Sequence, residues 1–234
     1  MLPVAIVEND PMLPGAGWVG RVLNERAIPW TLLRAFTDDL AALRVEEASA
    51  LVVLGGRQHA WEEVEHPQLR VEREAMELAL ELDLPILGCC LGGQILARAL
   101  GGEVFEARAG EHGWLEIRTT AAAREDPLLV HAGEAAEVYL WHGDAFTVPA
   151  SATLLAETDV SPQAFRVGRA WGLQFHPEVD LETYRVWHGN FPDACTAVGI
   201  DQSAADATAL RRETGDDLFV RRMIGAFADV ISGD

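Results

Sequence analysis

Residues 87–94 read Leu-Gly-Cys-Cys-Leu-Gly-Gly-Gln, and this stretch decides the fold. A short apolar run from Pro85 to Gly88 is typical of a buried strand, and an apolar helical pattern begins near Leu91. Gly88 and Gly92 stand two residues before and two residues after Cys90. This pattern predicts a sharp strand-to-helix turn, because small flanking residues let the backbone bend and expose the central side chain.

Cys90 is therefore the candidate nucleophile. At the start of a helix the positive end of the macrodipole favours its thiolate form. The same turn leaves the Leu91 N–H free to stabilise an oxyanion. We expect Cys89 to point back into the sheet as a small packed side chain, and Cys195, which lacks flanking glycines, to be a packed thiol as well.

Outward from this turn, apolar runs alternate with helical patterns. Strands are expected at Val4 to Val7 and Ala50 to Leu54, with a weaker one at Ile28 to Leu33. Helices are expected at Gly17 to Arg26 and Gln68 to Leu82. The alternation predicts an α/β fold with a doubly wound, mostly parallel central sheet that is covered by helices on both faces.

Beyond the helix that starts near Leu91 the sequence changes character. Short strand-like segments follow one another, and some of them should form a small antiparallel extension of the sheet: Glu103 to Ala107, Trp114 to Thr119, Val138 to Trp141, Thr153 to Glu157, Gln163 to Val167 and Ala170 to Gln174. Residues 181–234 are expected to be helical, most clearly at Ala205 to Arg212 and Leu218 to Val230. A length of 234 residues favours a single domain over 1–234.

The charge and the composition exclude several classes of function. A formal net charge of −19 would repel a nucleic acid backbone, and no apolar run is long enough to span a membrane. All 18 basic residues are Arg. Without Lys there is no P-loop lysine and no Schiff base to a pyridoxal cofactor. No His or Cys spacing suggests a metal site, and no segment resembles a secretory signal, so a cytoplasmic protein is expected.

A second segment, Trp-Gly-Leu-Gln-Phe-His-Pro-Glu at residues 171–178, supplies a candidate base. An apolar strand ends at His176, and Pro177 prevents the strand from continuing before Glu178. The imidazole can then face a thiol while the carboxylate of Glu178 holds its other nitrogen. This is the arrangement of a base and its orienting group in a catalytic triad.

GCCLGGQ (88–94) and QFHPEV (174–179) resemble the two signature segments of the class I, triad-type glutamine amidotransferases. The resemblance is clearest from residue 50 to residue 179. It implies a flavodoxin-like fold and a triad of Cys90, His176 and Glu178 that needs no cofactor and no metal. It also implies that the N–H of Gly56, in the glycine loop after residues 52–54, completes the oxyanion hole with Leu91.

The same resemblance implies a set of substrate-binding residues. Trp141-His142-Gly143-Asp144 is similar to the loop that holds the α-amino and carboxylate groups of glutamine, and Gln94 matches a residue that contacts the glutamyl group. The predicted substrate contacts are therefore Gln94, Trp141, Gly143 and Asp144. Two positions depart from the family pattern: residue 93 is Gly where His is frequent, and residue 57 is Arg where Pro is frequent.

These observations predict hydrolysis of the γ-glutamyl amide of glutamine through a Cys90 thioester, giving glutamate and ammonia. The ammonia would pass to a separate synthase, because no region of this chain resembles an ATP-binding or acceptor-activating domain. One alternative is a stand-alone hydrolase of γ-glutamyl amines or conjugates. A lesser alternative is a non-catalytic binding or regulatory protein that keeps the fold. The motifs predict how the glutamyl acyl group is bound and transferred to Cys90, and they do not indicate which amine leaves.

Overall fold

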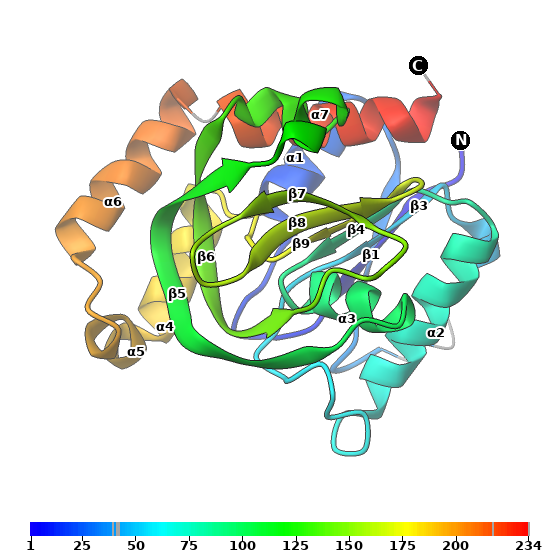
Figure 1. Cartoon of the computed structure of the whole chain (residues 1–234), viewed down its shortest axis with the longest axis horizontal. Helices are drawn as coiled ribbons and strands as arrows, with labels where there is room; N and C mark the ends of the chain where they lie inside the picture. The colour runs from blue at the N-terminus through cyan, green and yellow to red at the C-terminus, as the bar shows by residue number, and fades with distance from the viewer. Residues whose placement is uncertain (39, 41–42, 217, 234) are drawn as a thin grey trace.

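The computed structural model describes residues 1–38, 40, 43–216 and 218–233. These residues form one nine-stranded sheet in the order β2-β1-β3-β4-β9-β8-β7-β5-β6, with helices on both of its faces (Figure 1). The strands are β1 (Val4–Glu8), β2 (Trp30–Arg34), β3 (Ala50–Val53), β4 (Ile86–Cys89), β5 (Val104–Thr119), β6 (Ala135–Phe146), β7 (Thr153–Glu157), β8 (Pro162–Val167) and β9 (Ala170–Leu173). The helices are α1 (Gly17–Glu25), α2 (Pro67–Glu81), α3 (Leu91–Ala99), α4 (Leu181–Asn190), α5 (Pro192–Ala197), α6 (Gln202–Arg211) and α7 (Leu218–Ser232).

The first half of the sheet is parallel. Strands β2, β1, β3, β4 and β9 run in the same direction, and β1 lies between β2 and β3. Successive residues of these strands pack on opposite faces. Val4 and Ile6 join a core with α1 and α7, whereas Ala5 and Val7 join a core with α2 and α3. The predicted doubly wound α/β fold is confirmed.

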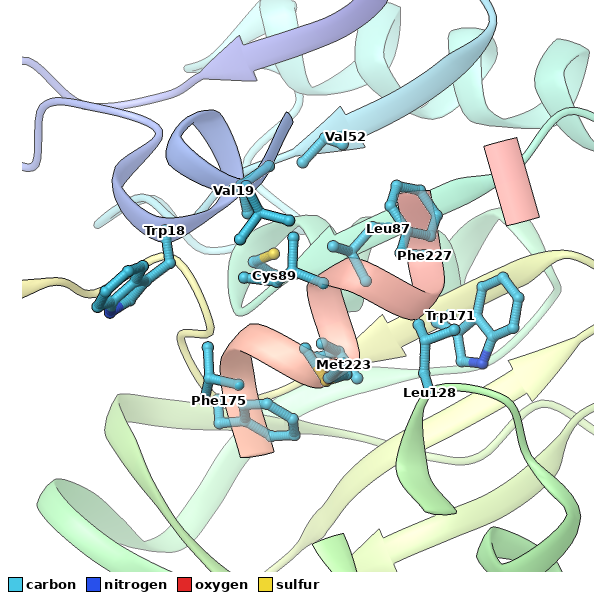
Figure 2. Close-up of a cluster of buried hydrophobic side chains, with 14 of the residues drawn as sticks. Trp18, Val19, Val52, Leu87, Cys89, Leu128, Trp171, Phe175, Met223 and Phe227 are labelled. Atoms are coloured by element: carbon cyan, nitrogen blue, oxygen red, sulfur yellow. The ribbon is translucent and has the colours of Figure 1, made fainter. Parts of the chain in front are cut away.

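Figure 2 shows the core between the sheet and α7, where Met223 and Phe227 of that helix face Leu87 of β4 and Trp171 of β9. Cys89 lies in this core and is fully buried, as expected for its side chain. Each large apolar side chain buried here contributes about 1.5–3 kcal/mol to the free energy of unfolding. Such packing fixes the position of β4, and therefore of the turn that follows it.

The second half of the sheet is antiparallel and is made by β8, β7, β5 and β6. The two strands expected at 103–107 and 114–119 are one strand, β5, which continues through a register shift between Glu106 and Glu111. The prediction of two strands was wrong at this point because Gly110 and Gly113 resemble a turn, whereas β5 stays paired with β6 on both sides of the irregularity.

From Leu181 onward the chain forms the expected helices, α4 to α7, the last of which ends at Ser232; residues 217 and 234 of the predicted helical region lie outside the described residues. Helix α7 returns to pack beside α1 (Figure 1). Helices α4 and α6 instead pack on β6, with Tyr184, Trp187 and Ala205 against Tyr139. Among the described residues, no helix combines the length and the apolar character that a membrane span requires.

Candidate active site

The two signature segments meet at the carboxyl ends of neighbouring strands. Cys90 directly follows β4, and His176 lies three residues beyond the end of β9, which pairs with β4 in parallel. The backbone N–H of Cys90 donates to the carbonyl oxygen of Leu173 at 2.8 Å, which ties the turn to the end of β9. Ligands of open α/β sheets bind at such strand ends. Residues 90 and 176, far apart in sequence, are thereby brought to one site.

The turn at Cys90 has the strained geometry that its glycines predict. Cys90 has a φ of 50°, in the left-handed region that residues with a side chain rarely adopt. A Cβ atom at Gly92 would overlap the carbonyl oxygen of Val53, and one at Gly93 would overlap that of Leu173. Gly93, the departure from the family pattern, therefore lets α3 approach the end of β9 closely.

His176 and Glu178 form a buried pair. Nδ1 of His176 lies 2.8 Å from Oε1 of Glu178, and both side chains are almost fully buried. The Trp18 N–H donates to the Glu178 carbonyl oxygen at 2.9 Å, which holds the segment after Pro177 against the start of α1. The orienting contact predicted for the imidazole is present.

The environment of His176 favours its protonated form. Burial by itself lowers the pKa of His176, but Glu178 and then Cys90 raise that pKa to about 10. Nε2 of His176 is buried and has no hydrogen-bond partner among the described residues. The imidazole thus has one nitrogen held by Glu178 and one available to a reacting group.

The sulfur of Cys90 has two further polar neighbours. Nε2 of Gln174 lies 3.6 Å from Sγ, and Sγ lies 3.8 Å from the carbonyl oxygen of Trp141. Gln174 also lies within 3.4 Å of the Gln94 side chain, which is buried. Gln174 was part of the quoted segment but was not predicted as a site residue. The signal that marks it is a polar amide directly after the apolar strand β9, which the fold buries completely.

The glycine loop after β3 lies directly against this pair. A Cβ at Gly55 would lie 2.6 Å from Cε1 of His176, and one at Gly56 would lie 2.8 Å from a methyl carbon of Leu91. Nδ2 of Asn9 donates to the carbonyl oxygen of Leu54 at 3.0 Å and holds the loop in place. Leu91 is the first residue of α3, so its N–H has no acceptor within the helix. Gly56 and Leu91 are therefore adjacent, as an oxyanion hole formed by both would require.

A cavity of about 300 Å³ opens above Cys90 and His176. All four predicted substrate residues line it: Gln94, Trp141, Gly143 and Asp144. The remaining lining residues were not predicted from the sequence as binding residues, since they come from five separated segments: Leu13, Arg57, Gln58, His59, His112, His142, Trp187, Phe191 and Ala194. No sequence pattern joins these positions.

Asp144 is bound by a residue that sequence analysis missed. Nδ1 of His59 lies 2.6 Å from Oδ2 of Asp144, and this hydrogen bond raises the pKa of His59. On the same strand, Nε2 of His142 lies 3.3 Å from Oε2 of Glu111, a buried carboxylate that also accepts from Ser161 and Gln163. These contacts fix residues 141–144 along β6 as one wall of the cavity.

Arg57, the second departure from the family pattern, forms an ion pair with the buried Asp10 at the rim of the cavity. Cys195 is buried and lies 3.5 Å from Nδ1 of His188, in the packed position that was expected. No group of three or more His, Cys, Asp or Glu side chains among the described residues is placed to bind a metal ion.

Comparisons with known proteins agree with this site. The sequence model of the family described as glutamine amidotransferase class-I matches residues 18–187, a range that contains Cys90, His176 and Glu178. A glutamine amidotransferase-like protein of Salmonella typhimurium is 31% identical over 160 residues, which are 66% of this chain and 66% of that protein. A glutamine-hydrolysing GMP synthase of Leifsonia xyli is 34% identical over 158 residues, which are 65% of this chain and 29% of the synthase.

The chain thus spans just under two thirds of the first relative and less than a third of the second. Among solved structures, a glutamine amidotransferase from Thermotoga maritima is 28% identical and superposes with a TM-score of 0.89, covering 100% of this chain and 99% of that one. The family match extends over well over half of the chain. The turn at Cys90, the buried pair at His176 and these matches lead to one conclusion: the chain belongs to the class I glutamine amidotransferase family.

Proposed function

We propose that the protein hydrolyses the γ-glutamyl amide of glutamine, with Cys90 as nucleophile and His176 and Glu178 completing a triad. The observation that carries the proposal is the meeting of Cys90 and the His176–Glu178 pair at neighbouring strand ends, facing one cavity. A thiol beside a buried, oriented imidazole is the arrangement that nucleophilic acyl transfer needs.

In the first half of the reaction, the Cys90 thiolate attacks the γ-carbonyl carbon and the carbonyl oxygen becomes an oxyanion. The N–H groups of Leu91 and Gly56 stabilise that charge. His176, held by Glu178, donates a proton from Nε2 to the departing nitrogen, the C–N bond breaks, and ammonia leaves.

In the second half, His176 takes a proton from water, whose oxygen attacks the thioester. The C–S bond breaks, glutamate leaves, and the thiolate is restored. Gln94, Trp141, Gly143 and Asp144 bind the glutamyl part, with the Asp144 carboxylate as partner for the α-ammonium group. This residue assignment is supported by their position on one wall of the cavity.

The relatives named GMP synthase favour a second step in which the ammonia is used by a synthase. This chain matches 29% of the length of one such synthase. The proposed partner is a synthase that receives ammonia. Assaying glutamine hydrolysis with the purified protein, alone and in cell extract, tests this: activity that depends on extract supports the partner, and full activity without extract contradicts it.

The proposal itself is tested by incubating the protein with a glutamine analogue that carries a chloromethyl ketone in place of the amide. We expect mass spectrometry to locate a single covalent adduct on Cys90, and ammonia release from glutamine to be lost in parallel. Cys89→Ala is the matched control, because Cys89 is the neighbouring thiol and is buried in the core. An adduct on Cys89 or Cys195 with Cys90 unmodified would contradict the proposal.

A further inference from the structure

The cavity above Cys90 has two chemically different walls. One wall is polar and is formed by Gln94 of α3 together with His142 and Asp144 of β6. The other wall is apolar and consists of Leu13, Trp187, Phe191 and Ala194. A glutamyl group, with its ammonium and carboxylate, matches the polar wall, so the proposed function gives the apolar wall no occupant.

The apolar wall begins at the imidazole of His176. The ring of Trp187 meets the ring of His176 edge-on, with ring centroids 4.8 Å apart and planes at 83°. Phe191 and Ala194 follow Trp187 four and seven residues later, across the junction of α4 and α5, and the Phe191 N–H donates to the Trp187 carbonyl oxygen at 3.0 Å. All three side chains line the cavity, with the Trp187 ring in contact with the His176 ring.

Proton donation decides which part of a substrate meets this surface. His176 can protonate the departing nitrogen only from hydrogen-bonding distance. Any substituent on that nitrogen therefore lies beside His176, next to Trp187, and extends toward Phe191 and Ala194. Ammonia carries no apolar surface and gains nothing from such a wall, whereas an alkyl or aryl substituent is removed from water there.

The charges around the wall indicate an uncharged substituent. Arg57 also lines the cavity, and its guanidinium lies 5.3 Å from the Phe191 ring centroid. Its charge is already paired with the buried Asp10. A formal net charge of −19 also disfavours an anionic ligand.

We propose that the protein cleaves γ-glutamyl secondary amides whose nitrogen carries an uncharged apolar substituent, seated on Leu13, Trp187, Phe191 and Ala194. This inference rests on the proposed function and extends its substrate class from the primary amide of glutamine to secondary γ-glutamyl amides. The overall step consumes one water: the C–N bond of the amide breaks after Cys90 forms the thioester, the amine leaves with the proton from His176, and water releases glutamate.

Three compounds separate the possibilities: glutamine, γ-glutamylbenzylamide and γ-glutamylphenylalanine, which adds a carboxylate to a similar ring. We expect kcat/KM for the benzylamide to exceed that for glutamine by about tenfold, because each additional apolar group that a pocket buries typically raises kcat/KM by at least this factor. We expect γ-glutamylphenylalanine to be slower than the benzylamide, because its carboxylate meets no unpaired cation.

Two variants test the wall itself. Phe191→Ala removes part of the surface, and Ala194→Trp fills the space in front of it. Both positions are only partly buried, so the fold tolerates the changes. Each variant should lower the benzylamide-to-glutamine ratio of kcat/KM by about tenfold. Phe105→Ala is the matched control, since Phe105 is exposed on β5 and does not line the cavity; the ratio should stay as in the unmodified protein.

The outcomes distinguish this inference from the function on which it rests. If glutamine is hydrolysed through Cys90 and the benzylamide is no better, or if neither variant changes the ratio, the apolar subsite is wrong and the triad stands. Faster cleavage of γ-glutamylphenylalanine than of the benzylamide also overturns the inference. If no compound is hydrolysed and the chloromethyl ketone leaves Cys90 unmodified, the proposed function fails and the subsite with it.

Discussion

The parallel half of the sheet and the cavity walls are built in different ways. In the parallel half, Cys90 and His176 are placed by backbone: two adjacent strands end side by side, and glycines allow the close approach. The walls are instead built from side chains of α3, α4, α5, β5, β6 and two loops, which meet only in the folded protein. The positions of the proposed nucleophile and base therefore depend on a few backbone segments that tolerate little substitution. The choice of substrate depends on cavity side chains that can be substituted independently of one another.

The largest expected effect comes from the backbone-fixed part. Cys90→Ala should lower glutamine hydrolysis by at least about 10⁴-fold, because no thioester can form. Ammonia release measured with purified protein checks this. Cys195→Ala, which removes a buried thiol on α5, should keep activity; a similar loss in both variants would mean that folding, not the nucleophile, had been lost.

Glu178→Gln should lower kcat/KM by about 10³-fold, since an amide orients the imidazole poorly and carries no charge. Glu178 raises the pKa of His176, so in the variant His176 loses its proton at lower pH. The alkaline limb of the pH–rate profile of the coupled Cys90–His176 pair should therefore move to lower pH. Rates measured from pH 6 to pH 10 check this. An unchanged limb would mean that Glu178 does not set the charge of the pair.

A pair of glycine variants compares the two regions directly. Gly92→Ala should destabilise the protein by about 3 kcal/mol, because the new methyl group would overlap the carbonyl oxygen of Val53. Gly143→Ala, in the wall formed by β6, has no atom within 4 Å of the new methyl group and should change the free energy of unfolding by less than about 0.5 kcal/mol. Denaturant unfolding of both proteins measures the contrast. An equal loss of unfolding free energy in both variants would contradict the conclusion that the turn at Cys90 tolerates substitution less well than the cavity wall.

An effect that develops only as pH rises is expected from Glu72, which lies on α2 and is fully buried. Burial raises the pKa of Glu72 to about 8, with the Asn9 side chain acting weakly in the opposite direction. Between about pH 5 and pH 8 the folded protein keeps a proton that the unfolded chain has lost, so stability falls as pH rises, by about 1 kcal/mol per pH unit.

Glu72→Gln should remove that slope, and the variant should gain stability relative to the unmodified protein as pH increases. Denaturant unfolding at pH 5, 6.5 and 8 measures it. Glu74→Gln, two residues away on the exposed side of α2, is the matched control and should leave the slope in place. A parallel pH dependence for Glu72→Gln and the unmodified protein would contradict the raised pKa.

Much of the fold could be predicted because the signals were local. The apolar run of β1, whose residues are all buried, and the apolar pattern of α2 each lie within one continuous segment. The length of β5 was missed because pairing with β6 outweighs the local tendency of its glycines to form turns. The geometry of Cys90 was predictable for the same reason as the fold: its glycines and its helix are sequence neighbours.

The cavity walls could not be predicted because no local rule joins their residues. Trp187 lies on α4, and a buried aromatic residue on a helix does not reveal from the sequence which part of the fold it packs against. His59 lies in a loop whose sequence carries no recognisable motif. Their places beside His176 and Asp144 follow from the packing of α4 on β6 and from the path of the loop after β3.

The sequence by itself determined the family and the parallel sheet, and it predicted Cys90, His176 and Glu178 as nucleophile, base and orienting carboxylate, because these inferences rest on signals that are local to short segments. The tertiary structure alone decided that Cys90 and His176 meet, that His59 holds Asp144, and that an apolar surface lies beside the imidazole. Contacts between segments distant in sequence depend on how whole elements pack, and that packing is a property of the complete fold.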